Sequence, residues 1–337
     1  MYSTSPTPEQ VEVLPPIGIG AIEAHRGRGT CGDAATTQSI GEPYCETVIE
    51  TPLGDIEYNE SGRGPTVVLA PGSCSTGAAW RPIVAHLKDD FRCVTTSLLG
   101  YGRTAERRTT GDADIAREAD VLEAVIIRAG GPVHLVGHSF GGLTALAVAL
   151  RKRVPLLSLM IIEAPAPEVL QLAREEQHYQ AFQKMTKAYF GAFEAGEAAA
   201  IESMIDFYGG PGTFAAWPAR VQAYALQTTA TNIRDWEAAY RFPLSLTALA
   251  DVEIPTLVVR GGASHPAIQC ANELIARNMA NASVMTLAGA AHFMISTHPR
   301  EVSAMIVQHC LPITGPDRGR GESVRPPFDD PAFAAGK

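Results

Sequence analysis

The sequence predicts an α/β protein built on a doubly wound, mostly parallel sheet, and three observations point to that class. Short apolar runs between residues 66 and 287 alternate with segments that have the apolar spacing of amphipathic helices. Several runs, such as residues 66–70 and 156–162, are unbroken, as expected of parallel strands buried on both faces. One run leads through a glycine-rich turn directly into a helical segment. Repeated strand–helix units of this order form parallel sheets covered by helices.

Composition narrows the class of protein. The 337 residues carry a net charge of −9 and 19% charged residues without a Lys/Arg-rich run, so we expect no nucleic-acid partner. The six cysteines form no Cys-x-x-Cys pair, which favours a reducing compartment. No signal peptide or membrane span is predicted. We therefore expect a cytoplasmic protein without a membrane partner.

The elements before the glycine-rich turn follow in a regular order. A hairpin is predicted over residues 46–61, because two apolar runs flank a Pro-Leu-Gly-Asp turn. The next predicted elements are a strand at 66–70, a helix at 78–87, a strand at 92–96 and a helix at 112–129.

A helical insertion interrupts the alternation after the strand at 156–162. Residues 167–249 show helical periods rich in aromatic residues, and strands resume only at 255–260 and 283–287, with helices at 267–279 and from Pro299. The predicted domains are an irregular arm (1–44), a core (45–166 and 250–311), a helical lid (167–249) and an irregular tail (312–337). The arm either wraps the body of the protein or contacts a second subunit, which would make a homo-oligomer.

The turn after the strand beginning at Val133 carries the strongest functional signal. Gly137-His138-Ser139-Phe140-Gly141 links that strand to an apolar helix, and Gly-x-Ser-x-Gly in this context places a serine on a strained turn as a nucleophile. The positions two before and two after the serine must be small, because strand and helix approach closely there. The alternative is a glycine-rich turn that happens to contain serine.

The order of parts resembles the α/β-hydrolase fold over roughly residues 46–310, of the lidded type found among bacterial serine esterases. The resemblance depends on four places: Ala70-Pro71-Gly72-Ser73, Gly100-Tyr101-Gly102-Arg103-Thr104, Gly137-His138-Ser139-Phe140-Gly141-Gly142 and Gly289-Ala290-Ala291-His292-Phe293. It implies that Ser139 is the nucleophile and that His292, just after the last strand, is the general base. His138, beside the serine, is expected to support the turn instead.

The third member of the predicted triad departs from the usual pattern. In most of this fold an aspartate follows the strand corresponding to residues 255–260, but residues 261–270 contain no carboxylate, and Ser264 stands where it is expected. Glu163 ends the strand next to the serine unit, as in those branches of the fold that take their acid from this strand. Glu163 is therefore the predicted acid; the alternative is an exposed or helix-capping glutamate.

The resemblance also implies an oxyanion hole made of two backbone N–H groups. The amide of Phe140 is the first predicted donor. Ser73 is the second, with Cys74 as the alternate, although Pro71-Gly72 replaces the His-Gly pair that is common in relatives.

Two classes of function are consistent with these residues. The first is a serine hydrolase that forms an acyl-enzyme on Ser139 and cleaves a carboxylic ester of a small to medium apolar substrate; lactone, thioester or carbon–carbon bond hydrolysis, and perhydrolysis, are variants. A serine at this position argues against dehalogenase or epoxide-opening chemistry. No metal-ligand spacing or phosphate loop predicts a metal or cofactor. The second class is a catalytically silent ligand-binding protein with this fold.

Overall fold

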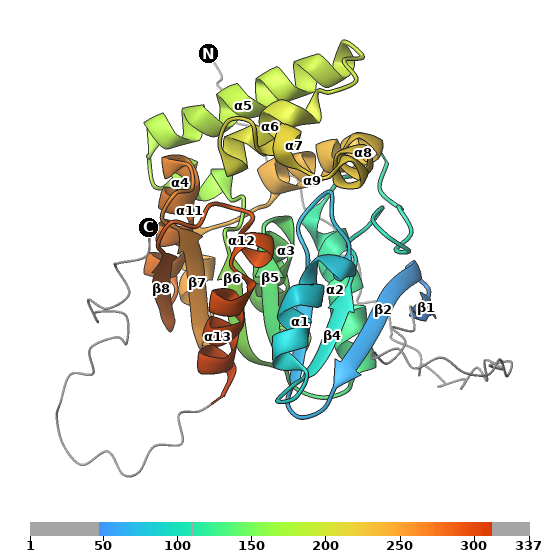
Figure 1. The fold of residues 1–337 in the computed structure, drawn as a ribbon. Helices are drawn as coiled ribbons and strands as arrows, with labels where there is room; N and C mark the ends of the chain where they lie inside the picture. Colours follow the sequence, from blue (N-terminus) through green and yellow to red (C-terminus); the bar gives the residue numbers. More distant parts are fainter. Residues whose placement is uncertain (1–46, 110, 312–337) are drawn as a thin grey trace, which may run out of the picture. The chain divides into compact units, whose positions relative to one another are not determined.

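The sheet forms the centre of the protein. The computed structural model describes residues 47–109 and 111–311, so the predicted arm (1–44) and tail (312–337) lie outside the described residues. Among these residues the strands form an eight-stranded sheet (Figure 1). Its order is β1 (Thr47–Thr51), β2 (Gly54–Gly62), β4 (Arg92–Thr96), β3 (Thr66–Ala70), β5 (Val133–His138), β6 (Leu156–Ile162), β7 (Thr256–Gly261) and β8 (Ala282–Leu287).

The sheet is mostly parallel, as predicted, with an antiparallel part at one edge. β1 and β2 pair antiparallel as the predicted hairpin, and β2 also pairs antiparallel with β4. From β4 to β8 all pairs are parallel. The chain starts at the edge strand β1, and its parallel part begins inside the sheet at β3, turns back to β4 and then runs from β5 to the opposite edge at β8. The carboxyl ends of β3, β5, β6 and β7 therefore meet at one rim.

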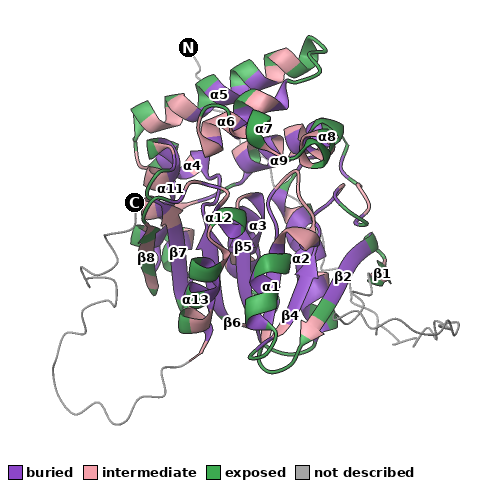
Figure 2. Cartoon of the chain, in the orientation of Figure 1, coloured by how far each residue is buried: buried purple, intermediate pink, exposed green. Residues whose placement is uncertain are grey.

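Helices cover both faces of the sheet (Figures 1 and 2). One face carries η1 (Gly77–Trp80), α1 (Arg81–Leu87), α12 (Met294–Thr297) and α13 (Pro299–Cys310). The opposite face carries α2 (Ile115–Ala129), α3 (Phe140–Arg151) and α11 (Pro266–Asn278). Successive residues of β3 alternate between the two cores, with Val68 on the side of α2 and α3 and Val67 on the side of α1.

The predicted and observed elements differ mainly at their ends. The strands at 66–70, 92–96 and 156–162 are confirmed to the residue. The helix predicted from Asp112 begins instead at Ile115, because the side chain of Asp114 accepts the backbone N–H of Ala116 as an N-cap. The segment predicted as one helix at 78–87 is a 3-10 turn followed by an α-helix that has Pro82 in its first turn.

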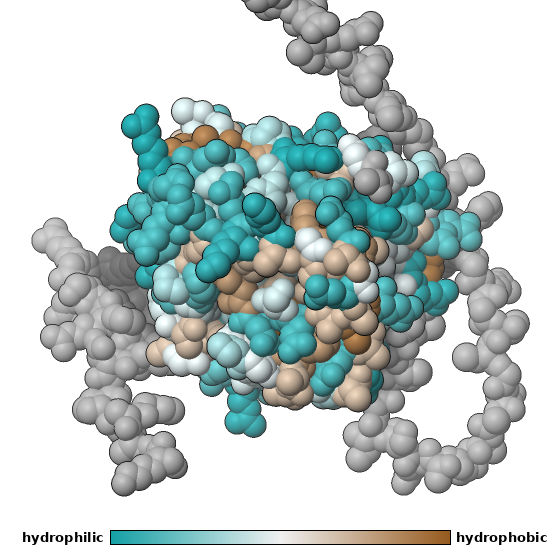
Figure 3. All heavy atoms as spheres, turned by 90° about the horizontal axis from the view of Figure 1, so that it is seen from above, coloured by the Kyte–Doolittle hydropathy of each residue, from teal (hydrophilic) through white to brown (hydrophobic). Residues whose placement is uncertain are grey.

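The residues between β6 and β7 are helical, as the aromatic-rich pattern predicts. They form α4 (Pro167–Leu172), α5 (Glu176–Glu194), α6 (Ile201–Gly209), α7 (Thr213–Ala216), α8 (Ala219–Gln227), α9 (Thr229–Arg241) and α10 (Leu246–Ala250). Figure 1 places α5 to α9 above the rim where β5 and β6 end. Seen from above, this face is largely hydrophilic, with apolar side chains exposed in patches (Figure 3). Within the described residues, no helix combines the length and apolar character needed to span a membrane.

Candidate active site

The turn between β5 and α3 holds Ser139 in a strained conformation. Its φ of 53° and ψ of −128° are rarely adopted by residues other than glycine. A Cβ on Gly137 would lie 2.2 Å from the carbonyl oxygen of Gly141, and one on Gly141 would lie 2.3 Å from that of Pro71. The close approach of strand, helix and loop expected from the two glycines is therefore confirmed.

The structure brings together the three residues predicted as a triad. Ser139 Oγ lies 2.9 Å from His292 Nε2, and His292 Nδ1 lies 2.8 Å from Glu163 Oε2. Glu163 is fully buried and His292 is 2% exposed. Because a carboxylate only accepts hydrogen bonds, the Nδ1–H of His292 donates to Glu163, which leaves Nε2 as the acceptor for the hydroxyl of Ser139.

Glu163 lies at the end of β6, facing the imidazole. Its backbone has a φ of 49°, and its amide donates to the carbonyl of Val259 on β7. Its second carboxylate oxygen, Oε1, accepts the backbone N–H of Gly261 at 2.6 Å. The alternative of an exposed strand-end or helix-capping glutamate is therefore wrong, because both oxygens are buried and engaged by the imidazole and a strand amide.

Ser264 occupies the loop that usually supplies the acid. Its side chain is 4% exposed, and its hydroxyl has no hydrogen-bond partner within the described part of the chain. The end of β7 contributes the backbone N–H of Gly261 to Glu163, and the side chain of Ser264 takes no part in these contacts.

His138 contacts the loop of the predicted base. Its Nε2 lies 2.8 Å from the carbonyl oxygen of His292, and the two rings are 4.9 Å apart. The pKa of His138 is lowered to about 3, mainly because the ring is buried and to a smaller extent because of the neighbouring His292. The neutral ring then donates from Nε2 to that carbonyl, which fixes the position of the His292 backbone.

The loop after β3 lies directly against the nucleophile. A Cβ on Gly72 would lie 2.8 Å from Cβ of Ser139. Ser73, Cys74 and Phe140 all line the cavity at Ser139, and their role as oxyanion donors stays a prediction. The pKa of Cys74 is raised to about 12, mainly because the thiol is buried and to a smaller extent because of the charge of Asp235. The thiol therefore stays protonated at neutral pH.

The cavity above Ser139 is small. It measures about 40 Å³, which is room for only a few water molecules. Most of its wall comes from the helical segment and from the loops at the rim: Ser73, Cys74, Ser139, Phe140, Pro165, Met204, Ile205, Tyr208, Trp217, Asn232, Asp235, Trp236, Ala239, His292 and Phe293. Three aromatic residues of the segment line the cavity (Tyr208, Trp217 and Trp236), whereas others pack against one another, as Phe182 does against Phe207 and Tyr189 against Phe190.

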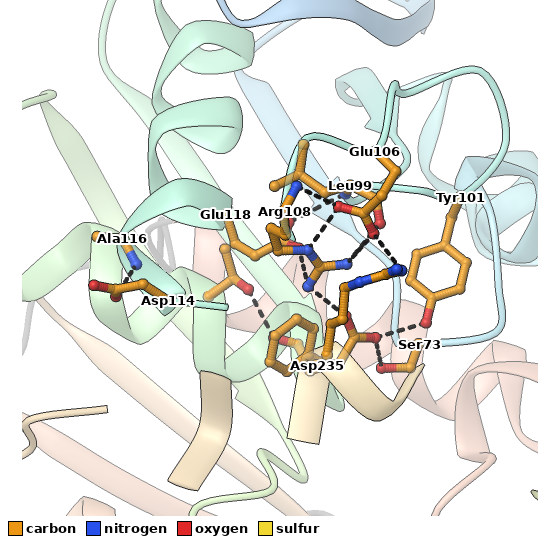
Figure 4. Close-up of polar contacts among 12 residues, drawn as sticks. Ser73, Leu99, Tyr101, Glu106, Arg108, Asp114, Ala116, Glu118 and Asp235 are labelled. Atoms are coloured by element: carbon orange, nitrogen blue, oxygen red, sulfur yellow. Dashed lines mark hydrogen bonds and ion pairs between the residues drawn. The ribbon is translucent and has the colours of Figure 1, made fainter. Parts of the chain in front are cut away.

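A buried charge cluster attaches α9 to the loops at the rim, and sequence reasoning missed it. Asp235 on α9 accepts hydrogen bonds from Ser73 Oγ at 2.5 Å, Tyr101 Oη at 2.6 Å and Arg108 Nη1 at 2.7 Å (Figure 4). The fully buried guanidinium of Arg108 also contacts Glu118 at 2.9 Å. No sequence signal connects Asp235 to Ser73, Tyr101 or Arg108, because these partners lie 127 to 162 positions away from it.

Burial dominates the electrostatics of this cluster. It raises the pKa of Asp235, an effect opposed by the charge of Arg108 and by the hydrogen bonds from Ser73 and Tyr101. Burial raises the pKa of Glu118 to about 8, again against the effect of Arg108, and Asp235 adds to the rise. Burial therefore favours the protonated form of Glu118, against the attraction of Arg108.

One group of described residues has the chemistry of metal ligands. Potential ligand atoms of Glu175, His178 and Cys270 lie within 4.8 Å of one another, between α5 and α11. The group is partly exposed and shares no residue with the cavity at Ser139.

Comparisons with known proteins agree with this architecture. The chain is 27% identical over 258 residues to the 2-(acetamidomethylene)succinate hydrolase of Mesorhizobium japonicum, covering 73% of this chain and 89% of that protein. It is 32% identical over 120 residues to the pimeloyl-(acyl-carrier protein) methyl ester esterase of Vibrio vulnificus, where it spans only 44% of that protein and 36% of this chain.

Solved structures show the same fold. The enol-lactonase of Burkholderia xenovorans superposes with a TM-score of 0.63 at 18% identity, covering 78% of this chain and 99% of that one. A sequence model of the alpha/beta hydrolase family matches residues 67–305, which include the serine turn, the end of β6 and the loop of His292. By this match and by its fold, the chain belongs to the alpha/beta hydrolase family.

Proposed function

We propose that the protein is a serine hydrolase that cleaves a carboxylic ester, or an ester-like bond such as a lactone or thioester, through an acyl-enzyme on Ser139. The observation that carries this proposal is the continuous series of hydrogen bonds from Ser139 through His292 to Glu163. A serine hydroxyl is a weak nucleophile at neutral pH, and a base held in the correct tautomer makes it reactive.

Each residue of this series has a distinct task in the proposed reaction. Ser139 Oγ attacks the carbonyl carbon while His292 Nε2 takes its proton, and Glu163 stabilises the imidazolium that results. The amides of Phe140 and Ser73 donate to the oxyanion of the tetrahedral intermediate. His292 then protonates the leaving alcohol, and a water activated by the same imidazole hydrolyses the acyl-enzyme.

The cavity supports a modest, largely apolar substrate. Its wall is rich in aromatic and aliphatic side chains such as Met204, Ile205 and Trp217, and these come from the helical segment, which we propose acts as a lid. The relatives named above include an esterase of a methyl ester and a hydrolase of an acetamido compound, so bond type varies within the family.

The silent-binder hypothesis rests on the carboxylate missing after β7 and on the histidine missing from the loop at Pro71-Gly72. The contact of Glu163 with His292 supplies the acid from another strand and so removes the first ground, which favours an enzyme. Carbon–carbon bond hydrolysis uses the same triad and is separated from ester hydrolysis by substrate assay.

A fluorophosphonate probe tests the proposed nucleophile. We expect the wild-type protein to be labelled at Ser139 and the Ser139→Ala variant to remain unlabelled. Ser264→Ala is the matched control, because it removes another buried serine hydroxyl and should leave labelling intact. A folded wild-type protein that takes up no label would refute the proposal. A panel of esters of increasing acyl length, run beside lactones, then defines the preferred bond.

A further inference from the structure

Two polar groups in the wall of the cavity are buried without a partner. Asn232 is 2% exposed and Tyr208 is 4% exposed. Neither the Oδ1 of Asn232 nor the hydroxyl of Tyr208 has a hydrogen-bond partner among the described residues. Buried polar groups are nearly always paired, and an unpaired one is destabilising, so two in one small cavity require an explanation.

These groups are opposite in their hydrogen-bonding sense. Asn232 Oδ1 is an acceptor, and the phenolic hydroxyl of Tyr208 is a donor. Burial raises the pKa of Tyr208 well above its usual value, so the hydroxyl keeps its proton. Tyr208 lies on α6 with its ring 4.2 Å from the ring of His292, and Asn232 lies on α9 and lines the same cavity as Ser139 and His292.

Asp235, one helical turn from Asn232, does not compete for the same role. Its oxygens already accept hydrogen bonds from Ser73, Tyr101 and Arg108, and the guanidinium balances its charge. The free acceptor in the cavity is therefore the neutral Oδ1 of Asn232. A neutral ligand group that presents one donor and one acceptor satisfies this pair without burying a new charge.

We propose that the cavity recognises an acyl substrate that carries a secondary amide close to the scissile carbonyl, with its N–H on Asn232 Oδ1 and its C=O on the hydroxyl of Tyr208. This inference rests on the proposed serine hydrolase function and specifies its substrate class. Both residues belong to the helical segment, so binding of the amide also holds that segment over the nucleophile.

Three ethyl esters of equal chain length test the two contacts separately. Ethyl N-butanoylglycinate carries the N–H and the C=O, ethyl 4-oxoheptanoate keeps only the C=O, and ethyl heptanoate has neither. Each kcat/KM is divided by the rate constant for hydroxide hydrolysis of the same ester, which removes differences in intrinsic reactivity. We expect the corrected value to fall about tenfold at each step, as for loss of one buried hydrogen bond.

The variants assign each step to a residue. Asn232→Leu should abolish the difference between the glycinate and the oxo ester. Tyr208→Phe should abolish the difference between the oxo ester and the heptanoate. Tyr189→Phe, which removes the hydroxyl of another buried tyrosine of the helical segment that does not line the cavity, should preserve both steps.

The results separate failure of this inference from failure of the proposed function. Wild-type values that agree within about twofold overturn the subsite even if the variants do not fold, because that is less than one buried hydrogen bond contributes. If none of the three esters is hydrolysed, the proposal of ester hydrolysis fails. Calorimetry of the three esters with the Ser139→Ala protein then tests the amide subsite by binding alone. Tightest binding of the glycinate supports the subsite, and equal dissociation constants overturn it.

Discussion

Replacing Glu163 by glutamine tests how His292 is held. Both oxygens of the native carboxylate accept hydrogen bonds, one from His292 Nδ1 at 2.8 Å and one from the Gly261 amide at 2.6 Å. A glutamine has only one acceptor, so one of these donors must face an NH₂ group. If that NH₂ faces His292, Nδ1 becomes the acceptor, the ring proton moves to Nε2, and the imidazole can no longer take the proton of Ser139.

The size of the effect follows from this tautomer change. Loss of the correct tautomer in a serine triad lowers kcat by about 10³–10⁴-fold, while the oxyanion donors and substrate binding retain activity above that of water. The substitution keeps the shape of the side chain and removes a buried charge, so we expect thermal unfolding close to that of the wild-type protein.

Hydrolysis of a p-nitrophenyl ester, combined with circular dichroism melting, measures both effects. Glu168→Gln is the matched control, since Glu168 lies five residues later on α4 and does not line the cavity at Ser139. A folded Glu163→Gln enzyme within about tenfold of wild-type kcat would show that the carboxylate does not set the tautomer, and the reasoning would fail.

Three further predictions concern the rim of the sheet. Arg108→Met leaves buried carboxylates without their cation and should lower the free energy of unfolding, measured in urea, by about 3–5 kcal/mol. The control Arg153→Met, at a largely exposed position, should change it by less than about 1 kcal/mol. Equal effects of the two variants would contradict the stabilising role of the cluster at Arg108. The pKa of Glu118 is raised to about 8, so the folded state binds more protons than the unfolded state between about pH 4.5 and pH 8. The contribution of Glu118 to stability is therefore lost as pH rises through that window, and Glu118→Gln should flatten the decline seen in urea titrations at several pH values; an unchanged slope would refute this sign. Gly72→Ala places a Cβ 2.8 Å from that of Ser139 and should lower kcat at least about tenfold, and full activity of the variant in the ester assay would show that this loop yields freely.

The sequence predicts the triad well, because each member has a local reason for its place. Ser139 lies on a turn that demands glycine on both sides, and His292 follows the last strand by a short loop. Glu163 could be found because a carboxylate at the end of a buried strand needs a partner, and parallel strands end at one rim.

The wall of the cavity could not be predicted in the same way. Asp235, Asn232 and Tyr208 lie on helices whose orientation over the rim depends on tertiary packing, and helical periodicity does not specify which loop a helix contacts. The partners of Asp235 are 127 to 162 positions away in the chain, so only the folded structure shows that they form one cluster.

The placement of Glu163 on β6 has a consequence for how such enzymes diverge. Because Glu163, directly after β6, already contacts the imidazole of His292, the proposed reaction requires nothing of the side chain of Ser264. A single Ser264→Asp replacement would add a carboxylate at the more common location while the existing one remains. An ancestor with both acids would stay active after losing either, so evolution can exchange one arrangement for the other without passing through a dead intermediate.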